Sequence, residues 1–314
     1  MYIERQTTYG WPIAIDLFLG GAGAGAFIGA LALRCLAMQQ SLARIVFLLS
    51  PLLVLLGALF LLADITIRTR FYRIFTSIKS WTSRGAWILT IFIISALTYT
   101  VISSHYLPFL QQFDTPAVRL FIGIIAALFS LLVMIYPGFL MGTIQAIPFW
   151  NTPLLPLLFL LSGLSNGVAC VIVIAPLFLT TPAPLVEVLR GFGSALIILT
   201  LLQAAALYAF LKSASRENAA SRESLRLLET SHCTRKMGIF GVVVPIALSL
   251  WGIFADEIQI ISLLSIISAA VLSLGGGLYL RYAIVHAGVF LPRFTIDSVP
   301  NPPRKGGLQE IGGL

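Results

Sequence analysis

The chain carries very little charge for its length. Charged residues make up 10% of the 314 positions, whereas hydrophobic residues make up 58% and the mean hydropathy is +0.97. A soluble protein of this size needs far more polar surface to cover its core, so this composition excludes the soluble globular class. The basic residues form no pattern typical of nucleic-acid binding, and we expect no nucleic acid as a partner.

Cysteine and histidine are also scarce, with three of each. Cys35, Cys170 and Cys233 lack the spacing of metal ligands, which argues against an iron–sulfur cluster or a zinc site. His105 lies at the end of the third expected span and His286 follows the eighth, on opposite membrane faces, so they cannot bind one haem iron. We therefore expect no metal, haem or iron–sulfur cluster in this chain.

Long apolar runs are abundant. A helix needs about 20 apolar residues to cross the roughly 30 Å hydrocarbon layer, and eight runs have about this length. They cover residues 12–35, 43–64, 86–107, 117–141, 153–178, 185–211, 238–255 and 258–283. The sequence predicts an all-α integral membrane protein with eight transmembrane helices in one membrane domain, 1–299. Two four-helix bundles are expected, with the break near 141–153.

The positions of the basic residues predict the orientation. With eight spans, both termini and the even-numbered loops share one membrane face, which we call the N-face. Sixteen of the 20 basic residues fall there, Arg281 among them, while Arg34, Arg44, Arg119 and Arg190 fall on the far face. The positive-inside rule then predicts a multi-pass protein of the inner (plasma) membrane with both termini in the cytoplasm.

Two polar segments lie outside the predicted spans. Residues 212–237 are compatible with an amphipathic helix at the membrane surface, but the pattern favours a solvated connector. Residues 300–314 begin with Pro-Asn-Pro-Pro and cannot continue a helix, so they form a polar C-terminal tail.

One carboxylate lies well inside an apolar run. Asp16 stands within Trp-Pro-Ile-Ala-Ile-Asp-Leu-Phe-Leu-Gly-Gly, residues 11–21. An ionisable group at this position costs several kcal/mol unless it is paired, protonated or hydrated, so a functional role is the first hypothesis. The glycines from Gly20 onward more often form a helix-packing surface than a cofactor site. Without a preceding strand they do not indicate a dinucleotide-binding turn either.

A tyrosine is expected at the same depth as this acid. Asp16 follows Pro12 by four residues, about 6–8 Å below the N-face, and the fourth span ends at that face with Tyr136-Pro-Gly-Phe-Leu. A phenol and a carboxylate at matched depth suit a ligand with an apolar body and carbonyl ends, such as a quinone, and the carboxylate can take a proton from a quinol. A simpler interpretation places Tyr136 in the aromatic belt at the membrane surface.

These residues resemble those of a known family. Residues 11–21, Tyr136-Pro-Gly-Phe-Leu with 147–165, and Leu-Arg-Tyr-Ala-Ile-Val-His-Ala-Gly at 280–288 are similar to hallmarks of the NrfD/polysulfide reductase membrane subunits, the PsrC-like family. The stretch Asp64-Ile-Thr-Ile-Arg68 resembles the acidic end of that family's second span. The resemblance extends over the whole chain.

The resemblance implies an eight-helix anchor that reacts with menaquinone or ubiquinone and holds no redox cofactor of its own. It also implies an iron–sulfur partner subunit with four clusters and a molybdopterin or other catalytic subunit. Asp16 and Tyr136 match the family positions that contact the quinone head group. The candidate site further includes residues of the flanking motifs: Trp11, Gly20, Asp64, Arg68, Trp150 and Asn151. The best-known relatives place this pocket outside the cytoplasm, whereas the basic residues here favour the cytoplasmic face.

Two other functions fit part of the pattern. A secondary transporter would use Asp16 as a coupling carboxylate, although transporters usually place such groups near the bilayer midplane. A passive anchor would only tether a partner and would leave a lipid-filled cleft beside Asp16.

Overall fold

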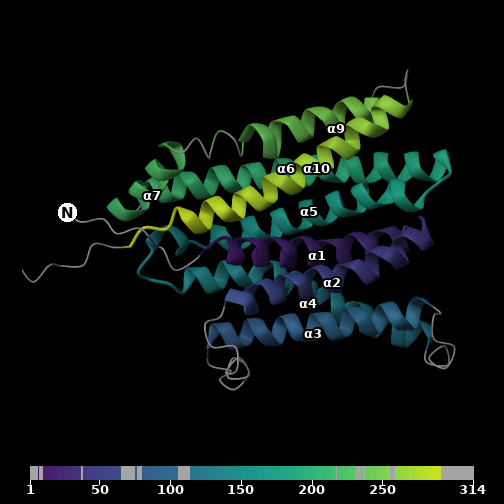
Figure 1. Ribbon diagram of the computed structural model, residues 1–314, viewed down its shortest axis with the longest axis horizontal. Coiled ribbons are helices and arrows are strands. Elements are labelled where there is room, and N and C mark those ends of the chain that lie inside the picture. The colour runs from purple at the N-terminus through teal and green to yellow at the C-terminus, as the bar shows by residue number, and fades with distance from the viewer. Residues whose placement is uncertain are drawn as a thin grey trace, which may run out of the picture.

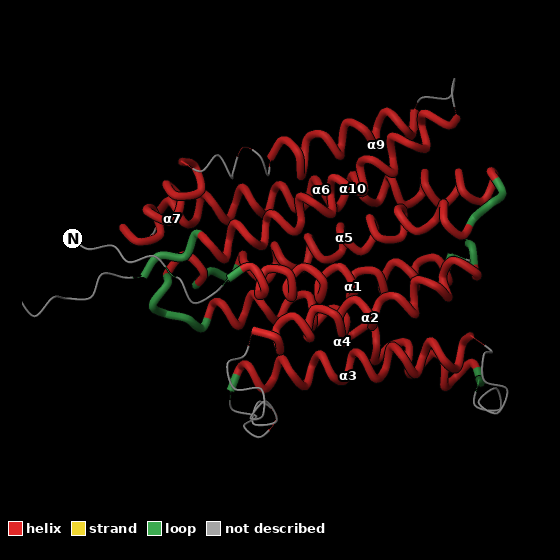
Figure 2. Tube along the Cα trace, viewed as in Figure 1, coloured by secondary structure: helices red, strands yellow, loops and turns green. Residues whose placement is uncertain are grey.

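The described part of the chain is built from helices and has no strand, as Figure 2 shows. The computed structural model describes residues 6, 10–36, 38–64, 75, 80–104, 114–216, 218–230, 235, 238–254 and 259–290; of residues 64, 104 and 259 only the backbone is described. The tail 300–314 lies outside these residues.

Seven helices are long and apolar enough to cross a membrane. They are α1 (Trp11–Cys35), α2 (Gln40–Asp64), α3 (Trp81–Ser104), α4 (Pro116–Gly142), α5 (Leu154–Phe178), α6 (Pro182–Arg216) and α10 (Gln259–His286). A shorter apolar segment consists of the π-helix η4 (Ile239–Val243) and α9 (Val244–Phe254). These eight segments confirm the predicted all-α, eight-span fold class.

The eight spans form two four-helix bundles. The helices α1 to α4 pack in a ring, and α5, α6, α9 and α10 pack in a second ring. The bundles meet mainly where α1 packs against α5, and α4 and α10 add to this junction. In Figure 1, α3 lies at one long edge, α9 lies at the other, and α1 and α5 run through the middle.

Small residues allow the two bundles to approach closely. Gly25 of α1 lies directly against Gly163 and Gly167 of α5, so a Cβ at Gly25 would overlap the α5 backbone. Such glycine contacts are typical of helix pairs in membranes, where close packing replaces the hydrophobic effect as the driving force. The glycine-rich part of the first span is therefore a packing surface, as the sequence indicates.

The segment after α6 is helical rather than an unstructured connector. The 35-residue helix α6 is about 52 Å long, well beyond the ~30 Å hydrocarbon layer, so its C-terminal part extends past the N-face. The helix α7 (Ala219–Thr230) follows and packs on η3 (Pro148–Trp150) with Ala220, Ser224 and Leu228 buried. The prediction of a solvated connector is therefore wrong, because one side of this polar helix covers the loop at Trp150.

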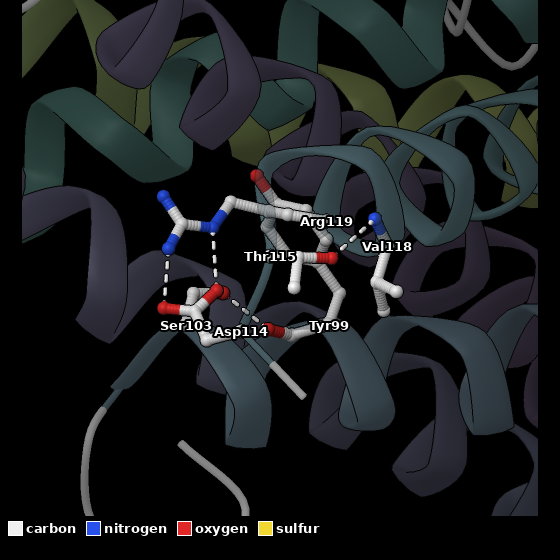
Figure 3. A network of polar contacts seen from close by, with 6 residues as sticks. All are labelled: Tyr99, Ser103, Asp114, Thr115, Val118 and Arg119. Atoms are coloured by element: carbon white, nitrogen blue, oxygen red, sulfur yellow. Dashed lines mark hydrogen bonds and ion pairs between the residues drawn. The ribbon is translucent and has the colours of Figure 1, made fainter. Parts of the chain in front are cut away.

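The far half of the first bundle has an aromatic core. Phe27 packs edge-to-face against Phe47, Phe92 and Tyr99, and all four rings are buried. Polar contacts close the far end, where Arg119 forms an ion pair with Asp114, as Figure 3 shows. The Thr115 hydroxyl accepts from the Val118 amide at 3.3 Å and caps α4.

Candidate functional site

Asp16 lies on α1, five residues after its start, and faces α2. A Cβ built at Gly57 of α2 would lie 3.1 Å from Asp16 Oδ1 and 3.2 Å from the Asp16 carbonyl oxygen. Gly57 thus provides the space that the carboxylate occupies. The side chain is only partly buried, and within the described part of the chain it has neither a hydrogen bond nor an ion pair. The carboxylate is therefore available to an external donor.

Tyr136 reaches the same region from α4. Its ring lies against Gly85 of α3, where any Cβ would overlap the phenol. The phenol is close enough to Asp16 for the two groups to interact electrostatically, and it too is only partly buried. A tyrosine and an aspartate from two helices therefore lie within electrostatic range of each other at the N-face end of the first bundle, each beside a glycine of another helix.

Aromatic rings surround this end of the bundle. The ring centroids of Trp11 and Phe60 are 6.5 Å apart in an edge-to-face arrangement. Trp81 stacks on Phe139 at 6.1 Å, and the Arg84 guanidinium lies 5.0 Å from the Trp81 ring centroid. Trp11 itself is 59% exposed. The polar pair thus lies next to an apolar, aromatic surface at the membrane boundary.

The other candidate residues lie in different surroundings. Gly20 is buried and faces Val133 of α4, and a Cβ built at Gly20 would lie 3.9 Å from Val133 Cγ1. Asp64 is the last residue of α2, and its side chain lies outside the described residues, as does Arg68. Of these three residues, only Gly20 is fully described, and it lies on the face of α1 that packs against α4.

Trp150 and Asn151 lie at the end of η3, in the segment that joins α4 to α5. Trp150 is fully buried, and its indole N–H donates a 2.9 Å hydrogen bond to the Ile284 carbonyl of α10. Asn151 is exposed at the end of η3. The contacts of Trp150 fix the loop after α4 to the C-terminal end of α10, which orients α4 and therefore Tyr136.

Arg281 is a buried charge that sequence reasoning missed. Arg281 lies two residues before the expected end of the eighth span and was counted with the charges of the N-face, whereas α10 continues to His286 and Arg281 is 1% exposed. Its Nη1 donates to Ser162 Oγ at 2.8 Å and to the Gly277 carbonyl at 3.3 Å. Arg281 thus keeps its place toward the N-face, but its side chain is buried between α10 and α5 and does not lie at the surface.

The described residues contain no group of three or more histidine, cysteine, aspartate or glutamate side chains placed to hold a metal. His286 is exposed at the end of α10 and stacks on Tyr282 at 4.5 Å. Cys170 is buried and Cys35 is exposed, both as free thiols. His105 and Cys233 lie outside the described residues.

The fold and this site define a class of protein: an eight-span helical membrane protein with an acid and a phenol near one membrane face. The model of the family "Polysulphide reductase, NrfD" matches residues 3–292. The chain therefore belongs to the NrfD/polysulphide reductase family.

Two curated relatives share part of this sequence. The C subunit of polysulfide reductase from Wolinella succinogenes is 30% identical over 194 residues, which cover 56% of this chain and 61% of the relative. Protein NrfD of Escherichia coli is 31% identical over 197 residues, which cover 54% of this chain and 60% of the relative. The matched region thus spans about three fifths of the length of each relative.

Proposed function

We propose that this chain is the quinone-reactive membrane subunit of a multi-subunit oxidoreductase and that Asp16 and Tyr136 bind the quinone head group. The observation that carries the proposal is the Asp16 carboxylate, unpaired within the described part of the chain, next to the Tyr136 phenol at one membrane face. An unpaired acid within a span is costly, and a bound proton donor offsets that cost.

The residues present fit such a ligand. Tyr136 supplies one hydrogen-bond donor and Asp16 one proton acceptor, which is the pair that a quinol or quinone needs at its polar positions. Both side chains are partly exposed, and Trp11, Phe60 and Phe139 provide an apolar surface for the ring and its tail. Menaquinone and ubiquinone both have this chemistry.

Each residue then has a defined task. A bound quinol supplies two electrons and two protons when it is oxidised. The Asp16 carboxylate would accept one of these protons and the other would pass to water at the N-face, while both electrons would go to the partner subunit. The Tyr136 phenol would donate a hydrogen bond to a quinol oxygen and so orient the ring. Gly85 leaves the space that the Tyr136 ring occupies, because a Cβ there would overlap the phenol, and Gly57 allows α2 to approach the Asp16 carboxylate closely.

The electrons need a partner, because the described residues hold no metal-binding group. The names of the two relatives refer to polysulfide reductase and to NrfD, and family membership supports an iron–sulfur partner subunit with a molybdopterin or other catalytic subunit beyond it. We place that partner at the N-face, nearest to Asp16, and the chain in the inner (plasma) membrane with both termini in the cytoplasm.

Two substitutions in the purified complex test the proposal. Asp16→Asn removes the proton acceptor and is expected to lower quinol-dependent electron transfer about 100-fold. Tyr136→Phe removes one hydrogen bond and is expected to lower it about ten-fold. Reduction of the partner by a soluble dye, measured in the same samples, should stay at the wild-type rate because it bypasses the quinone.

Matched controls come from exposed residues of α6. Glu187→Gln and Tyr208→Phe make the same chemical changes at side chains that no described contact links to Asp16, and both should keep the wild-type quinol rate. Wild-type quinol turnover in both site variants, in an intact complex, would remove the proposed function.

A further inference from the structure

The second unusual charge is Arg281, which lies across α1 from Asp16. Its guanidinium touches α1 at Gly21, packs 6.0 Å from the Phe18 ring centroid and lies 5.6 Å from the ring of Phe159 on α5. Within the described part of the chain, its hydrogen bonds go only to neutral oxygens of Ser162 and Gly277, and Nε is buried without a partner. Aromatic faces and neutral acceptors do not cancel a full positive charge.

Arg281 and Asp16 both lie in the N-face halves of their helices, and the guanidinium lies deeper, at the level of Gly21. Asp16 lies five residues from the start of α1, and Arg281 lies five residues from the end of α10 at the same membrane face. Each Cα is thus about 7–8 Å below the end of its helix. Neither has a charged partner in direct contact within the described chain.

Their separation follows from the geometry of α1. Asp16 faces Gly57 on α2, whereas Gly21 and Phe18 of α1 face Arg281. Five residues of helix rise and one helix width place the two charges about 13 Å apart. At an effective dielectric constant of about 20, opposite charges at this distance interact by about one pH unit, or a factor of ten.

Among the described residues of the helices packed on α1, Arg281 is the buried cation in the N-face half. The helices packed on α1 are α2, α4, α5 and α10. Toward Asp16, α2 contributes Gly57 and α4 contributes Tyr136. The N-face half of α5 has no ionisable side chain, and α10 contributes Arg281. On α3, Arg84 lies at the surface over Trp81, where water and salt screen it.

We propose that Arg281 is a positioning residue for the proton acceptor: across α1, its buried charge favours the ionised carboxylate of Asp16 and so sets the pH range in which quinol is oxidised. This inference rests on the proposed function of Asp16. Arg281 does not touch the ligand; it acts through the electric field in the membrane interior, where no ions screen it. Asp16 and Arg281, neither of which has a charged partner in direct contact among the described residues, thus gain a common role.

The test is the pH profile of quinol oxidation by the purified complex. Arg281→Met removes the charge, so the pH at which the rate is half-maximal should rise by about one unit, with about a ten-fold lower rate on the acidic side. Arg281→Lys keeps the charge and should keep the wild-type profile. In an Asp16→Asn background, Arg281→Met should leave the profile of the residual rate unchanged.

A second route avoids removing the arginine. Ser162→Asp places a carboxylate beside the Arg281 guanidinium, whose Nη1 already bonds to Ser162 Oγ, and should neutralise its field. It should shift the profile in the same direction as Arg281→Met, whereas Ser162→Asn, of similar size and no charge, should not. This pair keeps the guanidinium donors in place.

The outcomes separate the two proposals. If Asp16→Asn abolishes quinol oxidation but the Arg281→Met and Ser162→Asp profiles match wild type, the positioning role is wrong and the proposed function stands. If Arg281→Met and Arg281→Lys lose activity equally at every pH, Arg281 has only a structural role. Failure of both Arg281→Met and Ser162→Asp to assemble would likewise overturn the proposal.

Discussion

At the scale of single residues, the site depends on what stands opposite Asp16 and Tyr136. Each of these side chains lies against a glycine of a neighbouring helix, Gly57 on α2 and Gly85 on α3. A glycine costs about 1 kcal/mol relative to alanine in a helix, so its presence at both positions indicates that space for the side chains is needed. The glycines belong to the site as much as the acid and the phenol do.

Gly85→Ala tests this role of glycine. The added Cβ would overlap the Tyr136 ring, so the phenol must move, and we expect quinol oxidation to fall at least about ten-fold, as in Tyr136→Phe. Gly275→Ala is the matched control, because no atom lies within 4 Å of its added Cβ. Equal quinol oxidation rates in both variants would show that the position of Tyr136 does not matter.

The sequence makes Asp16 conspicuous, because an acid inside an apolar run is rare, but it gives no sign of the partners of that acid. Gly57 and Gly85 are two of 26 glycines, and only the packing of α2 and α3 reveals what they face. Arg281 was missed for a different reason. Arg281 lies two residues before the expected end of the eighth span, where a basic residue is normally read as a charge at the membrane surface, and hydropathy does not report that α10 continues to His286 and buries it.

At the scale of elements, the α1–α5 interface holds the molecule together and sets the position of Asp16. Gly25 of α1 and Gly163 and Gly167 of α5 bring the two backbones into contact. Hydroxyl groups add bonds elsewhere along α1: Ser50 Oγ donates to the Gly23 carbonyl and Ser130 Oγ to the Ala24 carbonyl, both at 2.8 Å. In lipid these bonds and close contacts carry most of the association.

Gly25→Leu should therefore separate the two bundles. The larger side chain collides with the α5 backbone, which cannot move without shifting the whole helix, and such overpacking costs several kcal/mol. We expect the melting temperature of the detergent-purified protein to fall by more than about 10 °C. Gly275→Leu, which introduces the same side chain into open space, should change it little. An unchanged melting temperature in Gly25→Leu would contradict the proposed role of this interface.

Most elements follow from composition, and the exceptions have physical causes. Six of the eight expected spans appear as continuous helices with ends shifted by a few residues, as for 86–107, which is observed as Trp81–Ser104. The sixth span is longer than expected because the end of α6 leaves the membrane, where apolarity no longer marks a helix. The helix α7 is short and polar, so its burial against η3 depends on tertiary contacts that hydropathy does not report.

At the scale of the whole molecule, the two faces of the membrane domain differ. The first bundle is filled by aromatic rings in its far half, and its polar pair lies near the N-face. The helices that border Asp16 continue through the midplane, whereas transporters of the broken-helix type interrupt theirs at the binding site. This arrangement favours a one-sided ligand site over a solute pathway.

The exposed thiol of Cys35 reports the orientation. It ends α1 at the far face, which the positive-inside rule places outside the cytoplasm. In a Cys233→Ser variant, a membrane-impermeant maleimide should label Cys35 in intact cells, and buried Cys170 should stay unlabelled. Labelling that requires permeabilised cells would place the N-face outside the cytoplasm instead.

Photoaffinity labelling tests most directly whether Asp16 and Tyr136 border the site of the quinone head group. An azidoquinone is irradiated with the purified complex, and the labelled peptides are identified by mass spectrometry with and without excess quinol. We expect labels in residues 11–20 of α1 and 130–142 of α4 that excess quinol removes. Labels confined to other helices, or labels that quinol does not displace, would contradict a quinone site at this acid–phenol pair.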